Sequence, residues 1–403
     1  MTDAPLHPLR RQRIAVAVLF VLAGTVMGGW QGRIPSVRAQ LGVGDGEWGL
    51  IVLGMPVGTL LSLLVLQRVV TRTGARRPAL LGAAILLVIA PLAAASQTTP
   101  VIVVSLAVMG MAVGMLFGPM NALAVEVERG YGRSILSSFH AWFSGGQFAG
   151  GLLGVLAGVV NLAPALQLAA SCVVLAALLL ATLRSLPDTQ RGPVLTPDEG
   201  VAPPQRSRAS WTPQLVILAA MCFLTSINEG GAAQWSAQYT VVLGGNIALG
   251  SLTLVCYSLA IAAVRLVGDR IVGRLGRRRF LQLSAGVAAV GLGVALVVGT
   301  VPAALIGFAC LGLGSGCIVP TVITLAGNQP GVPTAKAVAL INLGEWPAFL
   351  LGPPVIGGLA ELVGLRGALG VIVAGAVAIV VLAAFVRDRG PTAQSSSTTA
   401  SAA

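Results

Sequence analysis

Hydrophobic residues along the chain gather into long runs separated by short polar segments. The apolar runs cover residues 14–33, 48–67, 78–96, 101–124, 135–160, 164–183, 213–235, 247–267, 280–299, 302–325, 337–360 and 366–386. A helix needs about 20 apolar residues to cross the roughly 30 Å hydrocarbon core of a bilayer. The pattern therefore predicts an all-α polytopic membrane protein with twelve transmembrane helices, six in each half of the chain.

A polar segment rich in proline divides the runs into two groups. We expect residues 1–183 to form an N-terminal six-helix bundle and residues 213–386 a C-terminal one, joined by a cytoplasmic linker at 184–212. The linker holds five prolines among mixed charges, a composition typical of an extended segment. Residues 387–403 end in Ser, Thr and Ala, and we expect them to form a disordered cytoplasmic tail.

The composition excludes several classes of protein. Of the 403 residues, 56% are hydrophobic and 9% charged, whereas a soluble domain carries about 25% charged residues. The formal charge of +12 does not indicate a nucleic-acid partner, because the arginines lie at the ends of hydrophobic runs, where they orient helices and contact anionic lipid. The five cysteines lie within apolar runs without a metal-ligand spacing, so we expect reduced packing residues and no cofactor.

The distribution of cations predicts the orientation. If the N-terminus is cytoplasmic, all but Arg33, Arg38 and Arg366 of the 25 Lys and Arg residues fall on the cytoplasmic side. This asymmetry follows the positive-inside rule for multi-pass proteins. We therefore expect a multi-pass protein of the plasma (inner) membrane with both termini in the cytoplasm, acting as a monomer in the lipid bilayer.

The polar segment after the second run recurs half a chain later. Residues 67–77 and 269–279 are identical at six of eleven positions with an offset of 202 residues, and the same offset aligns two glycines of the fourth run with two of the tenth. Such a period indicates duplication of a six-helix half. Paired halves are typical of alternating-access transporters rather than of receptors or enzymes.

The repeated loop resembles the signature of the major facilitator superfamily, Gly-x-x-x-Asp-Arg-x-Gly-Arg-Arg. Arg72, Gly74 and Arg76 match it in the first copy, followed by Arg77, and Arg274, Gly276, Arg277 and Arg278 match it in the second. The resemblance implies the major facilitator fold, with two pseudo-symmetric six-helix bundles around a central cavity. Residues 137–146, 229–236 and 352–354 resemble a bacterial sugar-permease-like branch of that family.

Both copies of the loop depart from the family at its acidic residue. Thr71 and Gly273 occupy the position of the Asp that, by the resemblance, helps to lock the cytoplasmic gate. Arg265 and Asp269, four residues apart on one helix face, are a candidate substitute ion pair.

Polar residues within the runs are the candidates for chemistry, because each is costly to bury in a membrane. The third and twelfth runs are nearly free of them, as expected for helices outside the cavity. The candidates for substrate contact or proton coupling are Glu345, Glu229, Asn121, His140, Gln147, Gln234, Trp142, Trp346 and Asn342, with Gln31 on the first run.

Glu345 is the first candidate for a proton carrier. It lies eight residues past the start of its run, or about 12 Å deep at about 1.5 Å per residue. A carboxyl group there is expected to pair, to protonate or to contact substrate. The alternative is a neutral Glu that is hydrogen-bonded to a neighbouring helix.

The other polar candidates each have a functional and a structural interpretation. Glu229, estimated near the outer end of the seventh run, is either a gate or coupling group or a solvated residue of an outer funnel. His140 is either a proton shuttle or, as we favour, a packing residue. Asn121 contacts either substrate or a neighbouring helix.

The tryptophans and glycines divide by depth and spacing. Trp30 and Trp235 are expected in the interfacial belt, whereas Trp142 and Trp346 lie deeper and could line a cavity. Glycines recur every four residues at Gly146, Gly150, Gly154 and Gly158, a spacing that lets helices approach closely and slide where the two halves rock.

The function that these features favour is secondary active transport of a small organic solute by alternating access, with proton symport as the first choice. Proton-driven efflux of a drug-like or secondary metabolite is the alternative, and a non-transporting sensor is a third. The chain has no Gly-Lys-Ser/Thr nucleotide-binding loop and no His-Glu-x-x-His or Gly-x-Ser-x-Gly motif, so we expect neither ATP hydrolysis by that loop nor an enzyme.

Overall fold

The structure, a computed structural model, describes residues 6–132, 135–188, 212–329, 332 and 334–387, without the side chains of some residues within helices. The predicted linker and tail lie largely outside this part of the chain. The helices are α1 (Leu6–Leu41), α2 (Asp45–Ile51), α3 (Gly54–Thr73), α4 (Arg76–Ala94), α5 (Thr99–Tyr131), α6 (Leu136–Val159), α7 (Pro164–Thr182), the 3-10 helix η1 (Leu183–Ser185), α8 (Pro213–Val242), α9 (Ile247–Leu275), α10 (Arg277–Val298), α11 (Val301–Ser315), α12 (Ile318–Gly327), α13 (Thr334–Ala368) and α14 (Gly370–Ala384).

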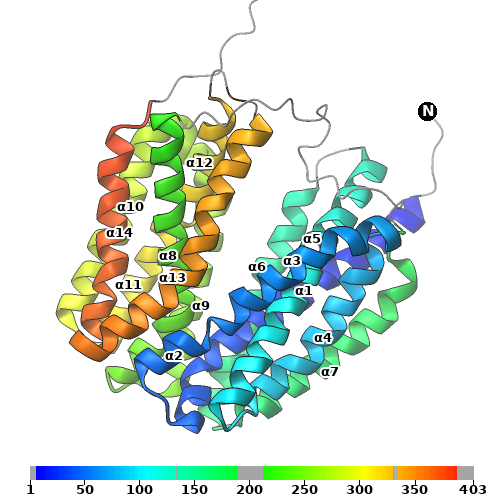
Figure 1. Ribbon diagram of the computed structural model, residues 1–403, viewed down its shortest axis with the longest axis horizontal. Helices are drawn as coiled ribbons and strands as arrows, with labels where there is room; N and C mark the ends of the chain where they lie inside the picture. Colours follow the sequence, from blue (N-terminus) through cyan, green and yellow to red (C-terminus); the bar gives the residue numbers. More distant parts are fainter. Residues whose placement is uncertain (1–5, 133–134, 189–211, 330–331, 333, 388–403) are drawn as a thin grey trace, which may run out of the picture.

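The described helices form two bundles, with α1–α7 in one and α8–α14 in the other (Figure 1). Ten helical segments of the described chain are long and apolar enough to cross a membrane, with α2–α3 and α11–α12 each counted as one. Together with α6 and α14 they give twelve spans, six in each bundle, which confirms the predicted fold class.

Residues with strong local preferences set the helix boundaries. Thr212 and Asn246 accept hydrogen bonds from Leu215 N and Leu249 N and so cap α8 and α9. The repeated loops end α3 and α9 in the same way, because Gly74 and Gly276 have φ of 75° and 74° and each donates its N–H to the carbonyl four residues earlier at 2.8 Å. This shared geometry supports the internal duplication.

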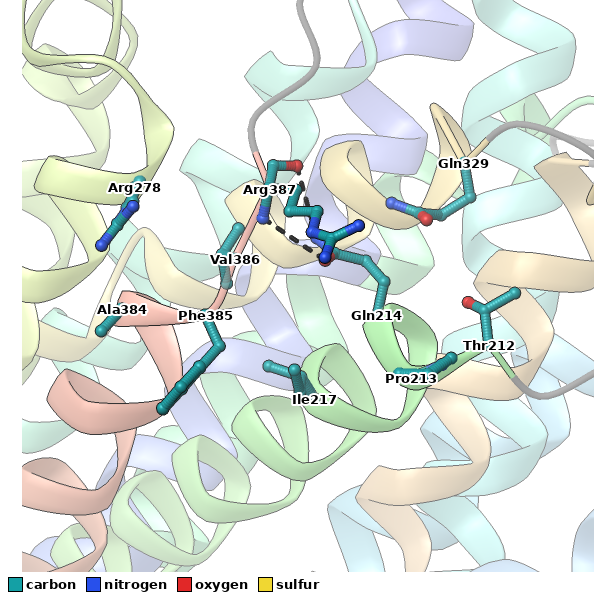
Figure 2. Close-up of a pocket in the computed structure, with 10 residues that line it drawn as sticks. All are labelled: Thr212, Pro213, Gln214, Ile217, Arg278, Gln329, Ala384, Phe385, Val386 and Arg387. Atoms are coloured by element: carbon teal, nitrogen blue, oxygen red, sulfur yellow. Dashed lines mark hydrogen bonds between the residues drawn. The ribbon is translucent and has the colours of Figure 1, made fainter.

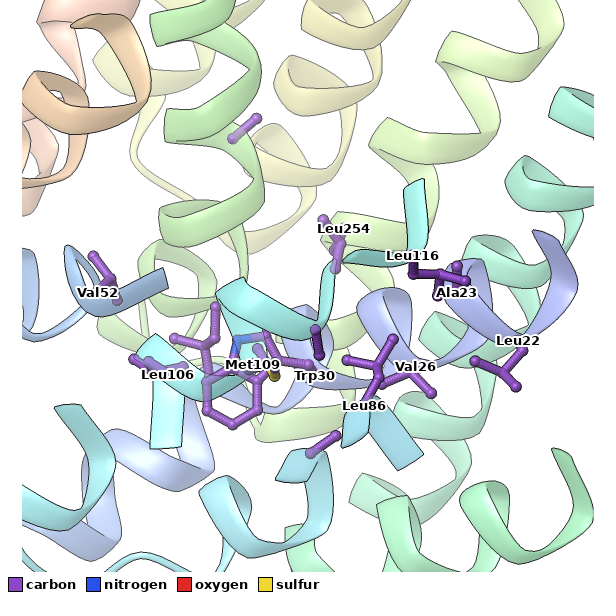
Figure 3. Packing of buried hydrophobic residues seen from close by; sticks show 14 of the residues in the cluster. Leu22, Ala23, Val26, Trp30, Val52, Leu86, Leu106, Met109, Leu116 and Leu254 are labelled. Carbon is purple, nitrogen blue, oxygen red and sulfur yellow. The ribbon is translucent and has the colours of Figure 1, made fainter. Parts of the chain in front are cut away.

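The bundles meet at one end of the molecule and separate at the other (Figure 1). We call the end where α2 lies against α13 the α2 end, and the opposite end, where α1 begins, the termini end. One cluster of buried apolar side chains extends from Trp30 and Val52 of the first bundle to Leu254 and Ile356 of the second, and part of it is drawn in Figure 3. Toward the termini end the second bundle has a separate core around Leu218, Met221 and Ile379. The apolar core is therefore shared between the bundles at the α2 end.

The glycine ladder of α6 serves two contacts rather than one. A Cβ on Gly150 would lie 2.1 Å from Thr25 O of α1, so this part of the ladder packs within the first bundle. A Cβ on Gly158 would lie 2.9 Å from Ala248 N of α9, so the ladder's far end packs against the second bundle. Only that end of the ladder fits the expected sliding contact between the halves.

Candidate functional site

The central feature of the structure is a pair of adjoining cavities between the bundles, which share Gln31, Gly230, Ala233 and Phe349 in their walls. We call the larger one, of about 470 Å³, the apolar lobe and the smaller one, of about 260 Å³, the polar lobe. Together they place apolar and polar side chains of both bundles around one space at the interface.

Apolar side chains dominate the walls of the apolar lobe. The first bundle contributes Met27 and Trp30 of α1 and Phe117 of α5, and the second contributes Ile227 of α8 and Phe349 of α13. The polar side chains in these walls are Gln31, Thr59 and Gln234. The lobe therefore suits the apolar body of a solute.

The polar lobe brings together amide, hydroxyl and charged groups. The first bundle supplies Gln31 and Gln147, whose side chains are joined by a hydrogen bond from Gln147 Nε2 to Gln31 Oε1 at 3.3 Å. The second bundle supplies Glu229 from α8 and Arg265 from α9. Arg265 Nε donates to the carbonyl oxygen of Gly316 at 2.9 Å, which fixes the base of its guanidinium against α11. The lobe thus holds a carboxylate and a guanidinium within one small volume.

Gln234 brings an acceptor to the apolar lobe. Its Oε1 is buried and has no hydrogen-bond partner among the described residues. Buried polar atoms are nearly always paired in folded proteins, so an unpaired acceptor in a cavity wall is suited to a donor on a ligand.

Close backbone contacts seal this site at the α2 end. Ser251 Oγ of α9 donates to Gly32 O of α1 at 2.7 Å, and both residues are buried. A Cβ on Gly357 of α13 would lie 3.0 Å from the Cα of Gly49 on α2. Gly46 N donates to Glu361 Oε1 at 2.8 Å. The bundles are held together here by backbone atoms and small residues, which allow the closest approach of two helices.

Arg38 adds an electrostatic contact at the same end. Its Nη2 lies 2.6 Å from Asp45 Oδ1, and its guanidinium carbon lies 5.9 Å from the ring centroid of Trp48 and 5.4 Å from that of Trp235 on the other bundle. Such cation–π contacts are favourable when desolvated, and Arg38 is buried. Trp235 and Trp30 are almost fully buried, so the prediction that they form the interfacial belt is wrong.

Five of the predicted substrate or gate residues line the two lobes: Gln31, Glu229, Gln147, Gln234 and Arg265. The depth expected for Glu229 was wrong, because α8 extends to Val242 and Glu229 lies well inside it rather than near its outer end. Arg265, expected at the inner gate, lines the polar lobe, while the side chain of its suggested partner Asp269 lies outside the described residues.

Three other candidates do not line either lobe. His140 is exposed on α6 and lies edge-on to Phe20, at 5.6 Å between ring centroids. Trp142 is 53% exposed and lines neither lobe, although the sequence suggested that it could line a cavity. Asn121 Nδ2 donates to Phe117 O of its own helix at 2.9 Å rather than to a neighbouring helix.

The candidates on α13 fall where side chains are not described. The helix passes through Asn342, Glu345 and Trp346, but their side chains lie outside the described part. Proton coupling at Glu345 therefore stays a prediction.

The loop residues lie at the termini end, with Gly74 and Gly276 in the turns already described. Arg76 donates to Asp188 Oδ1 at 2.8 Å and to Leu183 O at 3.0 Å, so it ties the loop to the end of α7. Arg72, Arg77 and Arg274 are exposed. Arg278 lines a separate hollow of about 640 Å³ with Arg387, which exchanges hydrogen bonds with Gln214 (Figure 2).

Several wall residues were not predicted as site residues. Tyr257 and Ser258 of α9 and Ser144 of α6 line the polar lobe, and Thr59 lines the apolar lobe. The sequence could have indicated them in the same way as the amides, because each carries a polar group, here a hydroxyl, inside an apolar run. Within the described residues, no three His, Cys, Asp or Glu side chains gather as a metal site requires.

Comparison with known proteins places this architecture among transporters. The family model described as Major Facilitator Superfamily matches residues 14–334 and 246–402. An uncharacterized MFS-type transporter of Yersinia pestis is 31% identical over 368 residues, covering 90% of this chain and 92% of that protein. The membrane protein MosC of Rhizobium meliloti is 29% identical over 373 residues, covering 92% and 89%.

Solved structures show the same fold at low sequence identity. A mutant of the nucleoside transporter NupG has a TM-score of 0.73 and 14% identity, covering 92% of this chain and 98% of that one. The D-xylose-proton symporter has a TM-score of 0.67 and 15% identity, covering 94% and 98%.

Proposed function

The chain belongs to the major facilitator superfamily, and from that premise we propose that it moves a small organic solute across the plasma membrane by alternating access, with proton symport. The solute has an apolar body and a polar or charged end. The apolar body occupies the apolar lobe and the polar end occupies the polar lobe.

The observation that carries this proposal is the two-lobed cavity whose walls come from both bundles. A solute in it contacts Gln31 and Gln147 on one side and Glu229 and Arg265 on the other. Rocking of the bundles changes the distance between these two sets, so solute binding favours some states over others. A ligand shifts a conformational equilibrium only by such differential contacts.

The proposed orientation puts the α2 end outside the cell. Two of the three arginines expected outside bind backbone carbonyls near helix ends there: Arg33 donates to Leu162 O beyond α6, and Arg366 donates to Leu296 O and Val297 O in the last turn of α10. The structure then corresponds to a state closed to the outside, with the bundles spread toward the cytoplasm (Figure 1).

Glu229 is the proposed coupling group among the described residues. It shares the polar lobe with Arg265, so a protonation change at the carboxyl group alters the charge that a solute meets. The likeness of the fold to the D-xylose-proton symporter supports proton coupling. Glu345 remains a second candidate for the same role.

Efflux of a more hydrophobic compound is a second candidate function. The apolar and aromatic walls of the larger lobe, with Met27, Phe117 and Phe349, favour it. In that case the solute enters from the cytoplasm or the inner leaflet and protons move in the opposite direction.

Thermal unfolding of the purified protein with a panel of sugars, organic acids, amines and hydrophobic drugs identifies the solute class. A ligand at 100 times its Kd adds about 2.7 kcal/mol of stability. The best ligand is then tested for uptake into proteoliposomes under an imposed pH gradient, with Glu229→Gln and the matched control Glu126→Gln, a partly exposed residue outside both lobes.

Symport predicts uptake driven by an acidic exterior and abolished in Glu229→Gln but retained in Glu126→Gln. Uptake driven by an acidic interior would replace symport with efflux. Binding without exchange of solute across the membrane would contradict transport and favour a sensor.

A further inference from the structure

A groove on the membrane-facing side of the first bundle is separate from the central cavity. It has a volume of about 610 Å³ and lies between α6 and α7, with Thr25 of α1 also in its wall. Its walls include the exposed side chains of Leu156, Val159, Val160 and Val174. In a spanning protein these side chains face hydrocarbon, so the groove is open to acyl chains rather than to water.

One polar side chain in the wall of this groove is buried without a partner. Gln167 is 5% exposed, and neither Nε2 nor Oε1 has a hydrogen-bond partner among the described residues. Its Nε2 lies only 3.2 Å from the position that a Cβ on Gly29 would take, so the amide is held against α1. Paired amides are the rule in protein interiors, and all the more so in a membrane.

Gln167 lies near the start of α7, a helix long and apolar enough to span the membrane. It lies three residues after Pro164, where α7 begins at the α2 end, or about 4.5 Å along the helix at about 1.5 Å per residue. The glycerol esters of a phospholipid lie at the border between the hydrocarbon core and the headgroups. An ester carbonyl is a hydrogen-bond acceptor, and the glutamine amide is a donor.

A positive charge lies beside the same end of the groove. Leu162 lines the groove, and its carbonyl oxygen accepts a hydrogen bond from Arg33 Nη2. Arg33 is buried and makes no ion pair with any carboxylate of the described residues. Its field favours a negatively charged group at this end of the groove.

We propose that this groove is a binding site for an anionic phospholipid. One acyl chain lies between α6 and α7, the ester carbonyl accepts a hydrogen bond from Gln167 Nε2, and the phosphate lies near the end marked by Leu162, in the field of Arg33. The site depends on neither the solute nor the direction of transport.

The test uses the full-length protein and phosphatidylglycerol with a photoreactive diazirine on one acyl chain, followed by peptide mapping. Label concentrates on the peptides of α6 and α7 that line the groove. Ala170→Trp, which fills the groove, lowers this labelling at least fivefold. The control Val173→Trp, on the exposed face of the same helix outside the groove, does not. Label spread evenly over all lipid-facing helices, unchanged by Ala170→Trp, would overturn the site.

A second measurement tests the role of the amide. Gln167→Leu removes the unpaired group, so without lipid its Tm is above that of the wild type, whereas phosphatidylglycerol raises its Tm by less than half as much. The exposed Gln67→Leu serves as the control and behaves as the wild type. An equal gain in Tm for wild type and Gln167→Leu would refute the proposed hydrogen bond. Equal labelling by phosphatidylcholine and phosphatidylglycerol would refute the preference for an anionic lipid.

Discussion

Replacing Gly357 by alanine tests the closed contact at the α2 end. A Cβ at this position would lie 2.6 Å from Asp45 O and 3.0 Å from the Cα of Gly49. Both are backbone atoms of the opposite bundle, so no side-chain rotation relieves the overlap, and α2 and α13 must separate. The neighbouring Gly358 is the matched control, because a Cβ there meets nothing within 4 Å.

The size of the effect follows from the overlap. Inserting a methyl group into a packed contact costs about 1–3 kcal/mol, and here the cost falls on the closed state alone. This shifts the ratio of outward-open to closed molecules about 5- to 150-fold. If about 1% of wild-type molecules are open to the outside, the Gly357→Ala population lies between about 5% and 60%. The gain in helix propensity from Gly to Ala is the same in both variants and cancels in the comparison.

The assay is labelling of Ala233→Cys, whose position lines both lobes, with a membrane-impermeant maleimide added to intact cells. The background lacks Cys256 and Cys310, the two described cysteines that are only partly buried. Gly357→Ala should label at least fivefold faster than the parent, and Gly358→Ala at the parent rate. Equal rates in the two variants would refute the reasoning that backbone contact at Gly357 keeps the outside closed.

Further predictions concern stability. Arg38→Gln leaves Asp45 without its ion pair in a half-buried site. We expect a loss of roughly 2–4 kcal/mol in the free energy of unfolding, measured by chemical denaturation in detergent. An unchanged free energy of unfolding would show that the pair contributes nothing to stability. Gly150→Ala places a Cβ 2.1 Å from Thr25 O and should cost at least about 3 kcal/mol, whereas Gly145→Ala, with open space around it, should be neutral. Equal thermal midpoints for these two glycine variants would show that α1 and α6 are not packed as described.

Much of the fold could be predicted because long apolar runs have few solutions in a membrane. The runs, their division into two groups and the repeated loop all appear in the structure, and the repeat extends to the matching φ angles of Gly74 and Gly276. The breaks between α2 and α3 and between α11 and α12 were not predicted, since each lies inside an apolar run and no charged or amide residue marks it.

The site was predictable by residue type but not by position. Gln147, Glu229 and Gln234 were chosen because polar groups are costly in a membrane, and all three line the lobes. Depth estimates failed where a helix continues into polar residues, as α8 does beyond Glu229, because the apolar run ends before the helix does. Trp235 contacts Arg38, and Arg76 pairs with Asp188. Both are tertiary contacts between segments far apart in sequence, which the local sequence does not indicate.

Solute counterflow in proteoliposomes tests the central claim most directly, using the ligand that best stabilises the protein and the Gly46→Cys/Glu361→Cys pair. The Cβ position of Gly46 lies 2.8 Å from Glu361 Cγ, so oxidation of the pair should lock the α2 end closed. The account predicts that exchange proceeds in the reduced protein, stops on oxidation and resumes on reduction. Exchange that continues at an unchanged rate with the disulfide formed would contradict a solute path that opens between the bundles at the α2 end.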